Sequence, residues 1–191
     1  MTDRNDITLA ELNGKRPRIH SSAFIAPGCR IIGDVEIGAD ASIWYNCVIR
    51  ADVNRIVVGA RTNIQDGTVV HCDSPKPGAP DGFPALIGEE VLIGHMAMVH
   101  GCVLHDRAFV GLGSIVMDGC IIESDGMIGA GAMLTPGKTI GARQLWLGRP
   151  AKYARDLDDD ALAGHRAGVR GYVQVARIHA KALGPIDRLA D

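Results

Sequence analysis

Three histidines close together in the sequence have the residue type of metal ligands. His71, His95 and His100 lie in one stretch that otherwise keeps a regular apolar pattern. Imidazole is a common zinc ligand, and three imidazoles leave the fourth position of a tetrahedral zinc ion free for water or substrate. The sequence therefore predicts a metal site of the open, catalytic type. Side chains that can carry charge or orient a substrate lie nearby, at Arg50, Asp52, Asn63, Gln65 and Asp66.

Two neighbouring thiols offer another set of ligands. Cys72 directly follows His71, and Cys102 lies two residues after His100. We favour the histidines because three imidazoles already satisfy the open-site pattern. The five cysteines are odd in number and form no C-x-x-C pair. We therefore expect buried or free thiols and no disulfide framework.

A repeat of six residues supplies the scaffold for these side chains. A branched apolar residue recurs every six positions, with interruptions after Ile49 and Val70 and a one-residue shift before Leu104. The pattern resembles the hexapeptide repeat of the left-handed parallel β-helix, in which three hexapeptides form a triangular coil and the apolar residue points inward. A β-sandwich of short strands is the alternative, but it calls for apolar alternation with period two. The repeat positions are Ile25, Ile31, Ile37, Ile43, Ile49, Val58, Ile64, Val70, Ile87, Ile93, Val99, Leu104, Val110, Val116, Ile122, Ile128, Leu134 and Ile140.

The predicted fold is all-β, a left-handed parallel β-helix with a C-terminal α-helix. The β-helix domain covers residues 1–150, with a protruding loop at about 72–86 that contains four prolines and two glycines. A helical segment over 151–191 packs along the β-helix or caps it.

Local sequence signals set the limits of the C-terminal helix. A run of carboxylates over 156–160 predicts its start, and Gly184-Pro185 predicts its end. Three glycines in its first half predict either a break or a helix that depends on packing. We expect His165 and His179 to be solvated.

The coil geometry aligns two of the three histidines. With three hexapeptides per coil, His71 and His100 occupy equivalent positions on successive coils, with Arg50 one coil earlier. Adjacent strands lie about 4.8 Å apart, which lets two imidazoles share one ion.

His95 falls in the neighbouring column, above Asp66. Its side chain should therefore point across another face of the prism. If it joins the other two histidines, the simplest geometry takes it from a second subunit in a closed ring.

Composition limits the classes of partner. A formal charge of −2 and a pI near 6.4 give no electrostatic basis for binding nucleic acid or an anionic membrane. No apolar run approaches the roughly 20 residues of a membrane span, and residues 1–10 hold no apolar secretory core. We therefore place the protein in the cytoplasm.

Several motifs together resemble the γ-class carbonic anhydrase family over nearly the whole chain. Members of that family are homotrimers with a metal ion at each subunit interface. The resemblance implies that His71 and His100 of one subunit and His95 of the next bind Zn²⁺, or Fe²⁺ or Co²⁺ in some members. The motifs are Ile49-Arg50-Ala51-Asp52, Thr62-Asn63-Ile64-Gln65-Asp66-Gly67, His71, Ile93-Gly94-His95, Val110-Gly111-Leu112-Gly113-Ser114 and Leu147-Gly148-Arg149-Pro150-Ala151-Lys152.

The resemblance also implies an activity, that of a carbonate dehydratase, a lyase that converts CO₂ reversibly to bicarbonate through a metal-bound hydroxide. Arg50, Asp52 and Asp66 correspond to charged residues that cross-link subunits and shape the site. Gln65 and Asn63 correspond to polar residues near the metal-bound solvent and the substrate. A structural ion pair is an equally good interpretation of Arg50 and Asp52.

One departure from the family pattern concerns proton transfer. The archetypal enzyme has a glutamate directly after its Arg-x-Asp and a second, proton-shuttling glutamate in an acidic loop. Here Val53 follows Asp52, and the loop offers only Asp73 and Asp81. Turnover is therefore expected to be slow, because a proton must leave in every cycle.

Two other functions are compatible with the repeat. Hexapeptide-repeat proteins include acyltransferases and thioesterases that act on CoA thioesters, many with one catalytic histidine and no metal. The chain is also compatible with a non-catalytic metal-binding subunit that keeps the trimer, and the missing glutamates favour that hypothesis.

Overall fold

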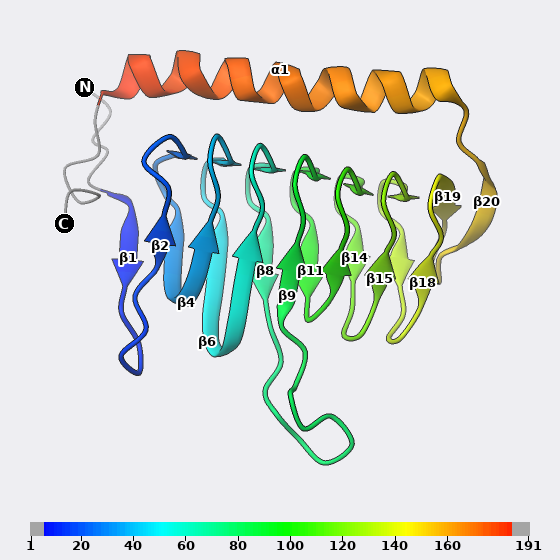
Figure 1. Cartoon of the computed structure of the whole chain (residues 1–191), viewed down its shortest axis with the longest axis horizontal. Coiled ribbons are helices and arrows are strands. Elements are labelled where there is room, and N and C mark those ends of the chain that lie inside the picture. Colours follow the sequence, from blue (N-terminus) through cyan, green and yellow to red (C-terminus); the bar gives the residue numbers. More distant parts are fainter. Residues whose placement is uncertain (1–5, 185–191) are drawn as a thin grey trace.

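The chain winds into a parallel β-solenoid with three flat faces, seen from the side in Figure 1. The structure is a computed structural model, and it describes residues 6–184. The first face contains the first halves of two long strands, β4 (Arg30–Ile37) and β6 (Val48–Val58), with β1 (Thr8–Ala10), β8 (Val69–His71), β11 (Met98–His100), β14 (Ile115–Val116) and β17 (Met133–Leu134).

The other two faces are built in the same way. The second contains the second halves of β4 and β6 with β2 (Arg18–Ile19), β9 (Ala85–Ile87), β12 (Val103–Leu104), β15 (Ile121–Ile122) and β18 (Thr139–Ile140). The third contains β3 (Phe24–Ile25), β5 (Ser42–Ile43), β7 (Asn63–Ile64), β10 (Leu92–Ile93), β13 (Phe109–Val110), β16 (Met127–Ile128), β19 (Gln144–Leu147) and the antiparallel β20 (Lys152–Asp156).

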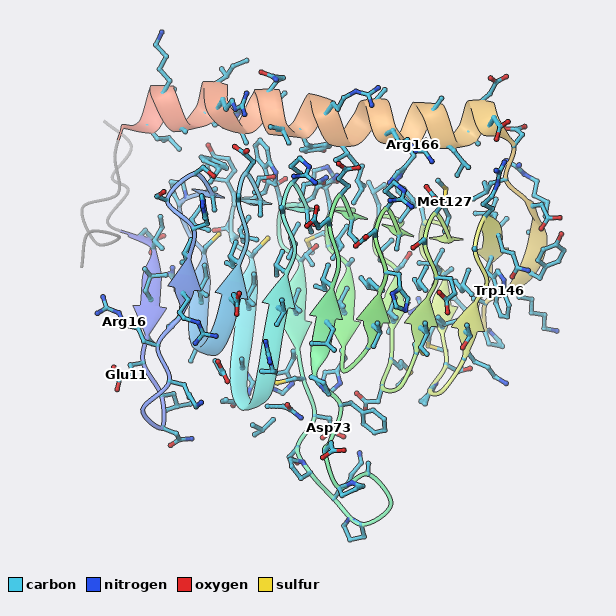
Figure 2. The ribbon with its side chains drawn as sticks, in the orientation of Figure 1. Glu11, Arg16, Asp73, Met127, Trp146 and Arg166 are labelled. Carbon is cyan, nitrogen blue, oxygen red and sulfur yellow. The ribbon has the colours of Figure 1, made fainter. Side chains whose placement is uncertain are left out.

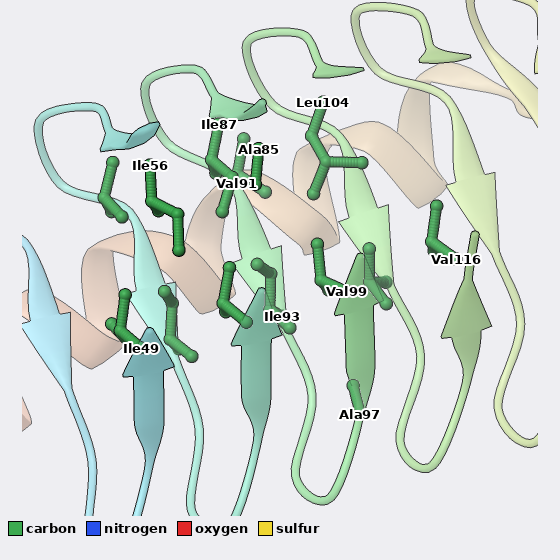
Figure 3. Packing of buried hydrophobic residues seen from close by; sticks show 14 of the residues in the cluster. Ile49, Ile56, Ala85, Ile87, Val91, Ile93, Ala97, Val99, Leu104 and Val116 are labelled. Atoms are coloured by element: carbon green, nitrogen blue, oxygen red, sulfur yellow. The ribbon is translucent and has the colours of Figure 1, made fainter. Parts of the chain in front are cut away.

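The core lies inside the prism and consists of the repeat positions. Every apolar position of the predicted six-residue repeat is buried, with at most 2% of its surface exposed. Figure 3 shows Ile49, Ile93 and Val99 among these side chains in the space between the faces. The predicted β-helix with a C-terminal helix is confirmed, and the solenoid matches a left-handed β-helix.

Close approach between coils explains the glycines that follow the apolar positions. A Cβ atom on Gly111 would lie 2.4 Å from the backbone nitrogen of Ala130 on the next coil. A Cβ atom on Gly59 would lie 2.4 Å from the carbonyl of Gly88. Only glycine lets the corners stack at this spacing.

The insertion after Ile49 forms an irregularity within β6. The parallel register pairs Gly33 with Ala51 but Val35 with Ile56, so residues 52–55 of β6 lie opposite a single residue of β4. This bulge at a corner gives Asp52 a direction that the regular repeat would not provide.

The C-terminal helix α1 (Asp159–Leu183) runs along the third face and contacts β3, β5 and β7 (Figure 1). The Asp158 carboxylate accepts a hydrogen bond from the backbone N–H of Ala161, which caps the helix. Gly184 closes its C-terminal end, as expected, whereas Pro185 lies outside the described residues. No helix in the described part of the chain is long and apolar enough to cross a membrane.

Packing keeps α1 continuous through its glycines. Of the two expectations, a break or a helix that depends on packing, the structure shows a continuous helix over its described residues, and aromatic side chains of the third face pack against its C-terminal half. Trp44 and Tyr172 meet edge to face at 5.5 Å. The expectation of solvated histidines is wrong, since His165 is only 8% exposed and His179 Nδ1 lies 2.9 Å from the Tyr45 hydroxyl.

Candidate metal centre

His71 and His100 lie side by side on the first face of the solenoid. Their strands, β8 and β11, pair in parallel register with the two histidines directly opposite each other. His71 Nδ1 lies 2.9 Å from His100 Nε2, and the ring centroids are 4.9 Å apart. Both side chains are partly exposed, so a small ligand can reach the pair from solvent.

A carboxylate holds the outer nitrogen of each histidine. Asp52 Oδ1 lies 2.8 Å from His71 Nε2, and Asp118 Oδ1 lies 2.5 Å from His100 Nδ1. Arg50 donates a hydrogen bond to the second oxygen of Asp52. Burial alone would raise the pKa of Asp52, but the hydrogen bonds from His71 and Arg50 outweigh burial and lower it. Asp52 is therefore a charged acceptor.

The two carboxylates determine which nitrogens of the histidines carry protons, and the result favours a positive charge between the rings. An ionised carboxylate can only accept, so the outer nitrogens of His71 and His100 carry the protons. In two neutral imidazoles the inner nitrogens are then both lone pairs, facing each other at 2.9 Å. Such an arrangement needs a positive charge between the rings, supplied by a proton or a metal ion.

The spacing also suits a metal ion. Two zinc–nitrogen bonds of 2.0–2.1 Å at a tetrahedral angle place the nitrogens about 3.3 Å apart. The observed 2.9 Å is within a few tenths of an ångström of that value. The residues present therefore fit a metal, with Asp52 and Asp118 in the supporting role that carboxylates play behind histidine ligands.

The other predicted residues gather at a different corner, between the third and first faces. His95 Nδ1 lies 2.9 Å from Asp66 Oδ2, and both side chains are well exposed. β7 pairs with β10, which places Asn63 and Gln65 beside this corner. Gln65 Nε2 donates to Asn63 Oδ1 at 3.1 Å, and both residues are buried. Asn63 Nδ2 is buried without a partner among the described residues.

The predicted site is thus divided into two halves. The paired-histidine half consists of Arg50, Asp52, His71, His100 and Asp118. The His95 half consists of Asn63, Gln65, Asp66 and His95. Within the described part of the chain, no three His, Cys, Asp or Glu side chains converge to hold a metal. A single chain therefore offers two imidazoles at one corner and the third at another.

The cysteines beside the histidines are poorly suited to binding a metal. All five cysteines are free and buried, as expected from the sequence. Burial raises the pKa of Cys72 and of Cys102. A raised pKa disfavours the thiolate form that metals require.

The loop over 72–86 protrudes from the side of the solenoid opposite α1 (Figure 1). Asp73 lies at its base (Figure 2), where its backbone pairs with that of Phe83. The Asp73 carboxylate pairs with Lys76. Asn54, from the β6 bulge, donates to the backbone carbonyls of Asp73 and Asp81 at 3.0 and 2.8 Å. The loop is therefore fixed at its base by the strand that carries Asp52.

Asp118 was not among the residues predicted from the sequence. It lies two residues after Val116, on the coil that follows His100. The next residue of the histidine column is Met117, opposite His100, and none of the motifs that carry the family resemblance includes Asp118. The sequence does contain a signal for Asp118. It is a carboxylate on the coil after His100, one residue past the position opposite that histidine.

Sequence comparisons identify the family. A family model described as bacterial transferase hexapeptide (six repeats) matches residues 16–51. The mitochondrial gamma carbonic anhydrase 2 of Arabidopsis thaliana is 41% identical over 173 residues, 91% of this chain and 62% of the relative. A carbonic anhydrase of Geobacillus kaustophilus is 42% identical over 170 residues, 89% of each protein. The chain belongs to the γ-class carbonic anhydrase family. The resemblance expected from the motifs is confirmed.

A solved structure has the same fold. The crystal structure of a hexapeptide transferase family protein from Anaplasma phagocytophilum superposes with a TM-score of 0.84 at 43% identity. The match covers 90% of this chain and 98% of that one. The chain spans only 62% of the length of the Arabidopsis relative. Membership of the family implies a metal cofactor in general terms.

Proposed function

We propose that this protein is a metal-dependent enzyme of the γ-carbonic-anhydrase type, which hydrates CO₂ reversibly to bicarbonate at the subunit interfaces of a homotrimer. The observation that carries the proposal is the pair of facing ring nitrogens, His71 Nδ1 and His100 Nε2, which lie 2.9 Å apart while a carboxylate holds the outer nitrogen of each ring. The relatives named carbonic anhydrases support the substrate.

We assign the metal to His71 and His100 of one subunit and to His95 of the next. Zinc is our first choice, with Fe²⁺ or Co²⁺ as alternatives. When bound, zinc supplies a nucleophile at neutral pH by lowering the pKa of water to about 7, the value known for carbonic anhydrase itself. The side chain of His95 is 40% exposed, so it is available to a neighbouring subunit.

The remaining residues of the proposed site orient the histidines and the substrate, and they balance the charge of the bicarbonate anion. Asp52 keeps the outer nitrogen of His71 protonated and its inner nitrogen free. Arg50 places a positive charge beside the pair, where it can attract the bicarbonate anion. Gln65 and Asn63 belong to the His95 half, so the neighbouring subunit contributes them to the site. Their amides can orient a polar atom of the substrate.

Proton removal is the slow part of the proposed reaction. Val53 is 43% exposed at the position where a glutamate would serve as a carrier. The Asp73 carboxylate forms an ion pair with Lys76, which makes it a poor proton carrier. Within the described residues, no glutamate forms a hydrogen bond or an ion pair with the paired-histidine half. We therefore expect a turnover limited by proton transfer to buffer.

Metal analysis and mixed oligomers test the proposal together. The purified protein should contain one metal per chain and hydrate CO₂, and the His71→Ala and His95→Ala variants should lose both properties. If the variants are mixed and reassembled, roughly one quarter of the sites should regain an intact set of ligands, because each shared interface draws its two halves independently. No recovery on mixing would contradict a shared site, and absence of stoichiometric metal in wild type would contradict the enzyme.

Two alternatives remain as outcomes of this test. Full acyl-transfer or thioesterase activity in the metal-free protein would favour the CoA-thioester enzymes of the hexapeptide class. Stoichiometric metal without CO₂ hydration would favour a non-catalytic metal-binding subunit, in keeping with Val53 at the glutamate position.

A further inference from the structure

Asp118 is fixed at the corner after β14 by the shape of the neighbouring coil. Val99 and Val116 pair in register, so Asp118 lies one residue beyond the position opposite His100. Gly101 leaves the room for its carboxylate, since a Cβ atom there would lie 2.4 Å from Asp118 Oδ1. The backbone N–H of Gly119 donates to the Gly101 carbonyl at 2.8 Å and holds the two corners together.

His100 is the only hydrogen-bond partner of the Asp118 side chain within residues 6–184. The other carboxylate of this half, Asp52, is shared between His71 and Arg50. Asp118 has no such arginine or lysine in an ion pair in the described structure. Asp118 adds to the charges that raise the pKa of Lys76, but its hydrogen bond goes to His100, so its directed effect is on that histidine.

We propose that Asp118 is a positioning residue for the metal, which acts by fixing the tautomer and the direction of His100. By accepting the proton of Nδ1, it keeps Nε2 as a lone pair that faces His71. The four side chains then form one array over four successive coils, in the order Asp52, His71, His100 and Asp118. This inference rests on the proposed metal site, and it adds a residue outside the motifs on which the family resemblance was based.

Metal affinity of the Asp118→Asn variant tests the inference. Asparagine keeps the size of the side chain and a carbonyl acceptor but removes the negative charge that favours a protonated Nδ1. Loss of a carboxylate behind a histidine ligand weakens metal binding by about 10–100-fold. We expect such a loss for Zn²⁺ by competition with a chromophoric chelator, and a shifted visible spectrum for the Co²⁺ form. Asp118→Glu, which restores the charge, should recover part of the affinity.

Asp106→Asn is the matched control. Asp106 also lies two residues after a core position, Leu104, and its carboxylate accepts a hydrogen bond from the backbone of Glu89 at 2.9 Å, away from the histidine pair. This variant should bind Zn²⁺ and Co²⁺ as wild type does. Equal affinity and equal Co²⁺ spectra for wild type, Asp118→Asn and Asp106→Asn would overturn the inference while leaving the proposed enzyme intact.

A second measurement needs no metal. Long-range ¹H–¹⁵N correlation spectra of the metal-free, histidine-labelled protein report which nitrogens of His100 are protonated. We expect Nδ1–H in wild type and a shift towards Nε2–H in Asp118→Asn. If wild type binds no metal, the proposed function fails, and this spectrum alone decides whether Asp118 sets the tautomer. An unchanged His100 spectrum in the variant would overturn the inference.

Discussion

Arg166 of α1 donates a hydrogen bond to Asp125, at the corner before β16, with an N–O distance of 3.3 Å. Figure 2 shows Arg166 on the side of the helix that faces the solenoid. Asp125 also accepts hydrogen bonds from Arg107, and its side chain is only 13% exposed. This contact joins the helix to the solenoid far from the aromatic contacts around Trp44.

Replacing Asp125 by asparagine should destabilise the protein by about 1–2 kcal/mol at neutral pH, because two arginines lose a charged acceptor. Asparagine tolerates the left-handed backbone of this position, where φ is 61°, so the change isolates the charge. The free energy of unfolding is measured in urea at equal protein concentrations. Glu36→Gln, which breaks an exposed pair with Arg18, is the control and should cost less than about 0.5 kcal/mol.

The Asp125 effect should fade in acid. Burial alone would raise the pKa of Asp125, but the hydrogen bonds and charges of Arg107 and Arg166 outweigh it and lower the pKa. A carboxyl whose pKa is lower in the folded protein stabilises it above the unfolded value of about 3.9, and this stabilisation is lost as the pH falls through the folded value. The two proteins should therefore converge below about pH 4. A difference that stays constant to pH 2 would contradict this assignment.

His165 should make the protein less stable as the pH falls. Burial lowers the pKa of His165, and neither ring nitrogen has a hydrogen-bond partner among the described residues. Asp125 acts in the opposite direction, while Arg166 and Arg107 add to the lowering. Below about pH 6.5 His165 is protonated in the unfolded chain but stays neutral in the folded protein, so the free energy of unfolding declines.

The His165→Leu variant should therefore be more stable than wild type by about 1 kcal/mol at neutral pH, because it removes two unpaired nitrogens. Its advantage should grow between about pH 6.5 and 5. Melting temperatures at the two ends of this range measure the effect. Parallel pH profiles for wild type and His165→Leu would rule out the buried neutral histidine.

The six-residue period predicted the fold because every inward position has the same surroundings. An interior column such as Ile49, Val70 and Val99 accepts only apolar side chains, so the period is visible without a structure. Counting along that column also placed His71 beside His100, because parallel register carries each residue directly onto its equivalent in the next coil.

Side chains at corners and under the helix were not predictable in this way. The contact between Asp118 and His100 depends on the space above Gly101 and on a rotamer, neither of which follows from a period. His165 was expected in solvent because helical spacing alone does not say which face meets the solenoid. Its ring instead packs edge to face against Phe109, at 5.6 Å.

Two glycine-to-alanine changes should have opposite effects on stability. In Gly111→Ala the new Cβ would meet the backbone of Ala130 at 2.4 Å, and relieving this clash should cost about 1–3 kcal/mol. In Gly164→Ala the Cβ meets nothing within 4 Å, on an exposed position of α1. That change should stabilise the protein by about 0.5–1 kcal/mol through helix propensity. Urea unfolding of both variants provides the measurement, and effects of the same sign would contradict the corner-stacking explanation.

Asn54 should control the opening of the loop beside the paired-histidine half. Its Nδ2 donates to two backbone carbonyls of the loop, those of Asp73 and Asp81. Removing the donor in Asn54→Ala leaves the Asp81 carbonyl without this partner and the Asp73 carbonyl with only the N–H of Phe83, so local opening should become about tenfold more frequent. Hydrogen exchange measured by mass spectrometry should accelerate in the peptide 72–86, whose amides at Asp73 and Phe83 close the base of the loop. Asn54→Asp keeps the size of the side chain and loses the same donor, so it should match alanine, while exchange in a peptide over 115–128 stays at the wild-type rate. If Asn54→Asp behaved as wild type and only alanine accelerated exchange, packing and not the donated hydrogen bonds would be holding the loop.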